Sequence, residues 1–587
     1  MLPWRGGHSA CQSVAKPDSV IRNIFLPAGV NTDMRLDRQR AREERPRPFG
    51  VLVRHFFGRF FDTESLSPQG DPQASMSQTL GVLAAPSAFF VLVFRPLTLV
   101  GWSLVWVRYI FLLFSMIVMG FIMVFEWDAL FPDRRDYQIL TPLPLRLPTV
   151  FLAKVAALGI FLAVFLLDIN FLGVLLWPGV DGGDGFFAIF LVHITALLAG
   201  GLFSALAIGA LHGLLITFLS GDLYRRVSIT IQTVLMGVLV MLLVLTLPMG
   251  QMIHGLLKSH SPALYWFPGF WFIGLYERLR PATHDAGLLA LGGMAIQALW
   301  ISAAVFLLTY LPGYRRHARK ILEAPAPSPS GPGPLFRGVA RGIDKLFLRG
   351  PVESAVFHFI GQTITRSMKH RLFLATYGGF GAALAVMTLG SDPTGLLRLP
   401  LTLSFVLVSG LRAAFNFPSE LSANWAFQIS ETAYAAEYVA ATRKWIALCA
   451  LLPLFAMLAV MEFICFAPGL ALFHLAFGFS LSVALTEAMF FGFRKVPFTC
   501  AHLPGKVNMS ALVFLYIFGF TMYSRLTAGL EAWLAVRPVA AIAFLASLGL
   551  SWLLFARWRA HAARTAVALD YEDPGDPVVR TLGLSPQ

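Results

Sequence analysis

The sequence predicts an all-α membrane protein that crosses the bilayer about twelve times, as an internal repeat of two halves with about six spans each. Hydrophobic residues make up 57% of the 587-residue chain and charged residues only 13%. A soluble fold of this length cannot bury so much apolar surface. Long apolar runs follow one another from Leu80 to Phe555, and a Pro-rich segment at 324–334 separates them into two similar sets.

The individual spans are runs of about 18 or more apolar residues, long enough to cross a hydrocarbon core roughly 30 Å thick. The first run contains Pro86, Arg95 and Pro96, so a broken or re-entrant segment is the alternative there. We expect the spans at 79–98, 104–125, 150–176, 187–219, 228–249, 286–311, 371–389, 399–415, 445–466, 469–492, 508–525 and 537–556.

The same runs divide the chain into regions. No cleavable signal peptide is recognised at the N-terminus, so the first span is expected to act as the insertion signal. The expected regions are a cytoplasmic N-terminal region over 1–78, a first transmembrane half over 79–311, a cytoplasmic Pro-rich linker over 312–354, a second transmembrane half over 355–556 and a cytoplasmic tail over 557–587.

The net charge of +14 does not indicate a nucleic-acid partner, because the positions of the basic residues matter more than their sum in a membrane protein. Basic clusters such as Arg225 and Arg226 fall in alternate loops. The loop 178–185, by contrast, carries only Asp181 and Asp184 as charged residues. The positive-inside rule therefore predicts a multi-pass protein of the cytoplasmic membrane with both termini and the linker in the cytoplasm.

Each half opens with a basic and aromatic segment. A helix over 49–61 would have one basic face and one aromatic face, and 355–370 has the same character before the seventh span. We predict a helix in the membrane interface at both places. Such a helix is either a general membrane anchor or an elbow with a specific role.

After its first two spans, each half contains a polar segment unlike the rest of that half. Both segments begin with Phe-Pro followed by acidic residues, and both end in basic residues at the next span. This correspondence supports the internal repeat. The residues of interest are Asp133, Arg134, Arg135 and Asp136 in the first half, and Glu420, Asn424, Trp425 and Glu431 in the second.

The order of elements resembles the permease subunits of type-2 ATP-binding-cassette (ABC) exporters. The shared features are a basic interfacial helix, two spans, a short charged segment and Pro-Leu-Pro residues before the third span, with 133–144 as the closest match. The resemblance implies that two six-span units form a pathway, and that the polar segments above dock on a cytoplasmic ABC ATPase. The chain departs from the pattern because its halves are fused and the second half lacks the Pro-Leu-Pro element.

The chain contains no phosphate-binding loop of the form GxxxxGK[ST]. The nearest segment, 502–507, lacks the required glycine spacing and hydroxyl residue, and is expected to be a tight cytoplasmic turn. The four cysteines stand singly and predict neither a disulfide framework nor a metal site. We expect no enzymatic activity and no cofactor in this chain, and energy supplied by a separate ATPase.

Ionisable residues inside apolar spans are costly and are candidates for function. Asp168 lies deepest and is the first candidate for a polar contact in a pathway. His193 and His212 are too far apart on one segment to share a site, and each is also explained as a core histidine with one hydrogen bond. Glu462 is a further candidate, with snorkelling to the interface as its alternative.

An aromatic segment at 265–276 lies between the fifth and sixth predicted spans. Aromatic rings favour the headgroup level, so an interfacial belt explains it. The family resemblance implies instead a short re-entrant helix at the outer mouth.

Three functions follow from these observations. The principal hypothesis is the permease of an ABC exporter, which moves an amphipathic or lipid-like substrate with a cytoplasmic ATPase and the lipid bilayer as partners. The alternatives are an ion-coupled secondary transporter that uses Asp168 or Glu462 as a proton site, and a membrane-embedded lipid-modifying enzyme.

Overall fold

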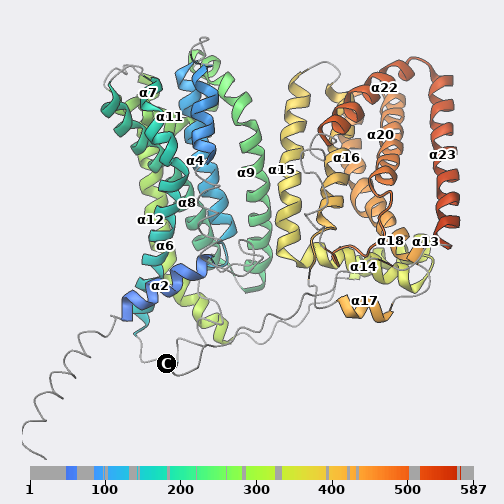
Figure 1. The fold of residues 1–587 in the computed structure, drawn as a ribbon, viewed down its shortest axis with the longest axis horizontal. Coiled ribbons are helices and arrows are strands. Elements are labelled where there is room, and N and C mark those ends of the chain that lie inside the picture. The colour runs from blue at the N-terminus through green and yellow to red at the C-terminus, as the bar shows by residue number, and fades with distance from the viewer. Residues whose placement is uncertain are drawn as a thin grey trace, which may run out of the picture.

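The computed structural model describes residues 48–61, 85–96, 98, 103–130, 142, 146–181, 185–219, 221–259, 261–280, 286–323, 334–391, 395–419, 424–430, 435–500, 516–564 and 569. The regular structure of these residues is helical throughout, with no strand among them. The helices form two bundles, one from each half of the sequence, that lie side by side (Figure 1).

Ten of the described helices are long and apolar enough to cross a membrane, so the chain is an all-α multi-pass membrane protein. Two of the predicted spans are not among them. At the first, 79–98, the described residues form the shorter apolar helix Ala85–Pro96, which is about 18 Å long. The other, 508–525, lies partly outside the described residues, and the described stretch 516–535 carries Arg525 and Glu531.

The first half is organised around α4, which is enclosed along most of its length. Helices α8 and α9 pack along it, and α6 and α11 complete its surroundings. The elements are α2 (Pro48–Phe61), α4 (Leu104–Phe125), α6 (Leu147–Leu176), α7 (Pro178–Asp181), α8 (Phe186–Phe218), α9 (Gly221–Lys258), α10 (Ala263–Trp266), α11 (Pro268–Leu279) and α12 (Ala286–Glu323).

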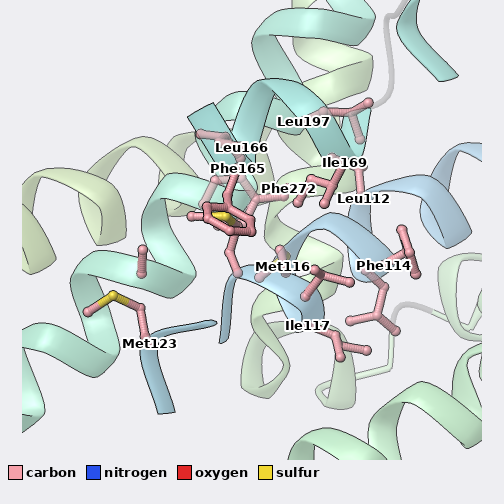
Figure 2. Packing of buried hydrophobic residues seen from close by; sticks show 14 of the residues in the cluster. Leu112, Phe114, Met116, Ile117, Met123, Phe165, Leu166, Ile169, Leu197 and Phe272 are labelled. Atoms are coloured by element: carbon pink, nitrogen blue, oxygen red, sulfur yellow. The ribbon is translucent and has the colours of Figure 1, made fainter. Parts of the chain in front are cut away.

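The core of this half consists of interlocking apolar side chains from α4, α6, α8 and α11. Met116 of α4 lies near Phe272 of α11, and Leu112 of α4 and Leu166 of α6 belong to the same cluster (Figure 2). Close approach is possible because α8 has glycines where it meets α4: a Cβ added to Gly200 would touch the Met116 side chain at 3.3 Å.

The second half is organised around α16, which packs against α15, α20 and α22. The helix that follows α18 contains a π-helical turn, and a second such turn precedes α22. The elements are α13 (Pro334–Phe347), α14 (Pro351–Arg366), α15 (Met368–Ser391), α16 (Gly395–Ala414), α17 (Asn424–Ser430), α18 (Ala435–Trp445), η2 (Ile446–Leu451), α19 (Leu452–Cys465), α20 (Pro468–Met489), η3 (Met522–Leu526), α22 (Thr527–Ala535) and α23 (Pro538–Arg564).

Helices occupy both segments where interfacial helices were predicted. Helix α2 buries Leu52, Phe56 and Phe60, which lie on one helical face, and it packs along α6 with the Phe60 ring 4.8 Å from that of Phe161. Helix α14 packs on α18. The expected linker, 312–354, is in large part helical, because α12 continues to Glu323 and α13 follows from Pro334.

The two halves meet where α9 packs along α15 (Figure 1). The backbones are in contact at Gly237 and Gly379, since a Cβ added to Gly379 would overlap the Gly237 carbonyl oxygen. Arg371 reinforces this joint by donating to the Thr233 hydroxyl at 3.1 Å and to the Ile229 carbonyl at 3.3 Å. Small residues thus allow two helices to cross closely in a membrane, where dispersion and hydrogen bonds drive association.

The bundles have two distinct ends. Helices α2, α14 and α17 lie at one end, which we call the basic end, and α7, α11 and α22 lie at the other, the far end (Figure 1). Basic side chains at the basic end include Arg59 of α2 and Arg366 of α14, whereas α7 carries Asp181. By the positive-inside rule, the basic end is expected to face the cytoplasm.

Cysteine labelling tests this orientation. In a variant without the native cysteines, Ser259→Cys beyond α9 and Ser419→Cys beyond α16 place exposed thiols at opposite ends. A membrane-impermeant maleimide applied to intact cells should label Ser259→Cys only, and Ser419→Cys only after the cells are opened. Labelling of both sites from outside would contradict the topology.

Candidate functional site

The chain is anchored as it leaves α4 at the basic end. Trp127, the second residue after the helix, is fully buried, and its indole nitrogen donates to the Ser228 hydroxyl of α9 at 2.8 Å. Its ring stacks on His212 of α8, with centroids 4.2 Å apart. The His212 Nε2 atom is in turn 2.8 Å from the Tyr224 hydroxyl of α9. Trp127 therefore joins the start of the first polar segment to two further spans.

Two more hydrogen bonds hold the same stretch. The Tyr310 hydroxyl of α12 donates to the Leu130 carbonyl at 2.6 Å, and the Gln232 amide of α9 donates to the Val124 carbonyl at 2.8 Å. Burial raises the pKa of Glu126 to about 8, so this carboxyl is mostly protonated at neutral pH. The end of α4 is thus held by three helices in a largely uncharged setting.

The predicted docking residues of the first half follow this anchor directly. Asp133, Arg134, Arg135 and Asp136 lie outside the described residues, so their docking role stays a prediction. The described stretch up to Leu130 nonetheless determines where their segment begins.

The second half anchors its polar segment by another route. The Asn424 side chain, at the start of α17, is buried and donates to the Thr499 carbonyl at 2.7 Å. The Ser419 amide donates to the Phe498 carbonyl at 2.9 Å, and the Phe498 amide to the Phe415 carbonyl at 3.1 Å. The segment that follows α20 therefore serves as a platform beneath α16 and α17.

Phe498 is the strained residue of this platform. Its φ of 68° lies in the left-handed region, which is costly for a residue with a bulky side chain. The strain is offset by aromatic packing, since the Phe498 ring lies 5.2 Å from Phe415 and 4.5 Å from the His370 ring. The His370 imidazole also lies 3.0 Å from the Phe417 carbonyl, so α15 joins the same platform.

Helix α17 presents an apolar face at the basic end. Trp425 and Ile429 lie on one helical face and are 62% and 78% exposed. Figure 1 shows the helix beyond α14, away from the rest of the bundle. Exposed apolar groups on a well-anchored element are typical of a protein-docking surface. Of the other residues predicted for this segment, Glu420 and Glu431 lie outside the described residues.

Ion pairs brace the helices around this platform. Lys444 of α18 lies 2.5 Å from Glu353 of α14, and Glu353 also accepts a hydrogen bond from the Arg349 amide at 2.9 Å. Arg443 lies 3.3 Å from Glu487 of α20. The first pair ties α14 to α18, and the second ties α18 to α20.

The predicted intramembrane residues do not converge on one site. Asp168 is half-buried on α6, and its shielded Oδ2 atom has no hydrogen-bond partner. His193 lies near the far end, where its Nδ1 atom is 3.3 Å from the Tyr276 hydroxyl of α11. His212 lies at the basic end against Trp127, so the two histidines are at opposite ends of α8 and do not share a site. Glu462 is enclosed rather than extended to the interface, with 0% exposure.

A buried ionic network that the sequence did not predict lies at the far end. Arg108 of α4 donates to both carboxylate oxygens of Asp181, at 2.8 and 2.5 Å, and to Glu277 of α11 at 2.6 Å. Its guanidinium lies 5.2 Å from the Tyr276 ring centre. An arginine inside a strongly apolar span is a signal in itself, but its acidic partners lie far away in the chain.

The partners of Glu462 are likewise distant from it in the chain or on another helix. Its Oε1 atom lies 3.3 Å from His474 Nε2 of α20, and His474 Nδ1 lies 2.5 Å from Glu531 of α22. Glu531 was not predicted as a site residue, because α22 has only nine residues and is too short to be read from the sequence as a span. Within the described residues, no group of three or more His, Cys, Asp or Glu side chains is placed to hold a metal ion.

Comparison of the chain with protein-family models, with curated proteins and with solved structures gave no match.

Proposed function

We propose that this chain is the permease of an ABC-type exporter, whose two fused halves work with a separate ATPase subunit. The observation that carries the proposal is that the segment after the second span is anchored to other helices in each half. In both halves it is anchored at the basic end, through Trp127 in the first and Asn424 in the second. In the second half the anchored element presents Trp425 and Ile429 to solvent.

The anchors give a route from a docked ATPase to the spans. Force applied after α4 would pass through Trp127 to α8 and α9, and through Leu130 and Tyr310 to α12. Force applied to α17 would pass through the Phe498 platform to α15 and α16. A docking segment can move spans only if it is rigidly joined to them, and these contacts supply that rigidity.

The far end would supply the second gate of an alternating-access cycle. The short helices α10 and α11 lie between two spans, and the network of Arg108 with Glu277 holds α11 in place. In the second half, α22 occupies the corresponding position before the last long helix. The apolar composition of the spans favours an amphipathic or lipid-like substrate.

Docking on α17 is testable with a double variant. We expect Trp425→Ala with Ile429→Ala to weaken ATPase binding by about 2 kcal/mol or more, roughly 30-fold, since a central exposed Trp is a typical hot spot. The measurement is the nucleotide-hydrolysing activity that copurifies with the tagged chain from its native membranes. The matched control is Leu346→Ala with Phe347→Ala, which removes exposed apolar side chains from α13.

An equal loss of copurifying ATPase activity in both double variants would indicate nonspecific adhesion. Undiminished copurifying activity in the α17 variant would show that the ATPase does not dock on this helix. Replacing Arg134 and Arg135 together with Glu applies the same assay to the first half, where like charges opposite one another would cost several kcal/mol if the segment docks.

The ion-coupled carrier is the second candidate, and the buried contact of Glu462 with His474 favours it. The two functions differ in energy source. Export by sealed inverted vesicles that requires ATP, and persists when the proton gradient is collapsed, supports the permease. Export driven by the gradient alone supports the carrier.

A further inference from the structure

One imidazole in the second half lies between two carboxylates. His474 of α20 is 2.5 Å from Glu531 of α22 through Nδ1 and 3.3 Å from Glu462 of α19 through Nε2. The three side chains are each 1% exposed or less. Three helices that are separate in the sequence therefore meet at a single dry, titratable cluster.

The contacts of this cluster depend on its proton count. A carboxylate can only accept, so the hydrogen bond between His474 and Glu531 needs one proton between its partners. The 3.3 Å contact of His474 with Glu462 is an ion pair without a hydrogen bond, and it needs a second proton to be attractive. Two protons satisfy both contacts, either as an imidazolium between two carboxylates or as a neutral imidazole with one protonated carboxyl. Loss of one of them leaves two negative charges in a dry site and one contact without a hydrogen. The cluster holds together only while it keeps both protons.

Other charged or ionisable groups lie on the elements that pack around the cluster. Arg398 is buried on α16, which packs against α19, α20 and α22. Arg525 of η3 is exposed, and Arg537 at the start of α23 lies 4.3 Å over the Trp533 ring. The phenol of Tyr523 lies near Ser404 at 3.4 Å. Glu487 is on α20 as well, but about 20 Å further along the helix.

The corresponding position in the first half is built differently. Glu277 of α11 and Glu531 of α22 both lie on the short helix that precedes the last long helix of their half, and both are buried against a cation-forming side chain. The partner of Glu277 is Arg108, which stays charged at all physiological pH values. The partner of Glu531 is His474, an imidazole that can be neutral or charged.

We propose that Glu462, His474 and Glu531 form a proton-binding site that latches α22 at the far end of the second half. With both protons bound, α22 is held against α19 and α20. Proton loss releases it, whereas the arginine of the first half keeps α11 latched throughout. The far end therefore has one permanent and one proton-operated latch. This device does not depend on an ATPase.

Thiol accessibility on α22 tests the latch. Ala528 is buried on α22, so Ala528→Cys, in a chain without the native cysteines, reports release of the helix. In purified full-length protein, labelling by a small maleimide should accelerate as the pH is raised, with a slope of up to about tenfold per pH unit for one linked proton. Leu275→Cys on α11, normalised to the unfolded protein, should show no such acceleration.

The matched control carries Glu462→Gln, His474→Gln and Glu531→Gln in addition to Ala528→Cys, so that no group of the cluster titrates. Glutamine keeps a donor and an acceptor, and the ratio of the two labelling rates at each pH removes the ordinary pH dependence of the thiol. We expect the excess acceleration to vanish in this control. It should also vanish in Glu462→Gln with Glu531→Gln, the second variant if the first does not fold, because a glutamine can pair with the imidazole in either charge state. An Ala528→Cys profile that matches that of either variant, or that of Leu275→Cys, overturns the latch.

Discussion

Replacing Arg108 with Met should lower the free energy of unfolding by about 3–5 kcal/mol. Arg108 is 1% exposed and is bonded to both Asp181 and Glu277, so its loss leaves two buried carboxylates without their cation. Methionine fills much of the same volume, which keeps the cavity contribution small. Thermal and denaturant unfolding of the purified protein in detergent, followed by circular dichroism, measures the change.

Two variants separate this effect from a general loss of charge. Arg278→Met removes an exposed arginine of α11 whose nearest polar contact is a long one, 3.5 Å to the Leu289 carbonyl, and should change stability by no more than about 0.5 kcal/mol. Adding Asp181→Asn and Glu277→Gln to Arg108→Met should recover most of the loss, because a neutral buried network no longer contains unpaired charge. If Arg108→Met and Arg278→Met unfold alike, the network does not hold α4, α7 and α11 together.

Gly379→Ala should separate the two halves where α9 crosses α15. The added methyl group would overlap the Gly237 carbonyl oxygen, and backbone cannot yield as a flexible side chain can. Overpacking of this kind costs about 1–3 kcal/mol. The measurement is the distance between nitroxide labels at the exposed positions Val234 and Phe380, which should lengthen, together with the unfolding free energy.

The neighbouring glycine supplies the control. A Cβ at Gly378 meets nothing within 4 Å. Gly378→Ala should therefore leave the label distance unchanged and should raise stability by roughly 0.5–1 kcal/mol, since alanine is the better helix former. Equal distances in both alanine variants would show that the halves do not depend on this crossing.

The sequence was sufficient for features that depend on local composition. Apolar length predicted the ten long helices, because a hydrocarbon core requires a run of that length in the chain itself. The basic and aromatic segment at 49–61 predicted α2, because its apolar residues repeat at helical spacing. Helix α22 was not predicted, because its nine residues are too few to be recognised by apolar length.

What only the tertiary structure decided is which residues meet. The sequence predicted Asn424 as a residue of interest, but not its partner Thr499 on the platform after α20. It did not predict Arg108 and its acidic partners as site residues. The pairing of His474 with Glu531 joins residues 57 positions apart in the chain. Composition determines whether a segment enters the bilayer, because the solvent acts on each segment independently. Contacts between distant segments depend on how the helices pack against one another, and a single sequence contains no local signal for that arrangement.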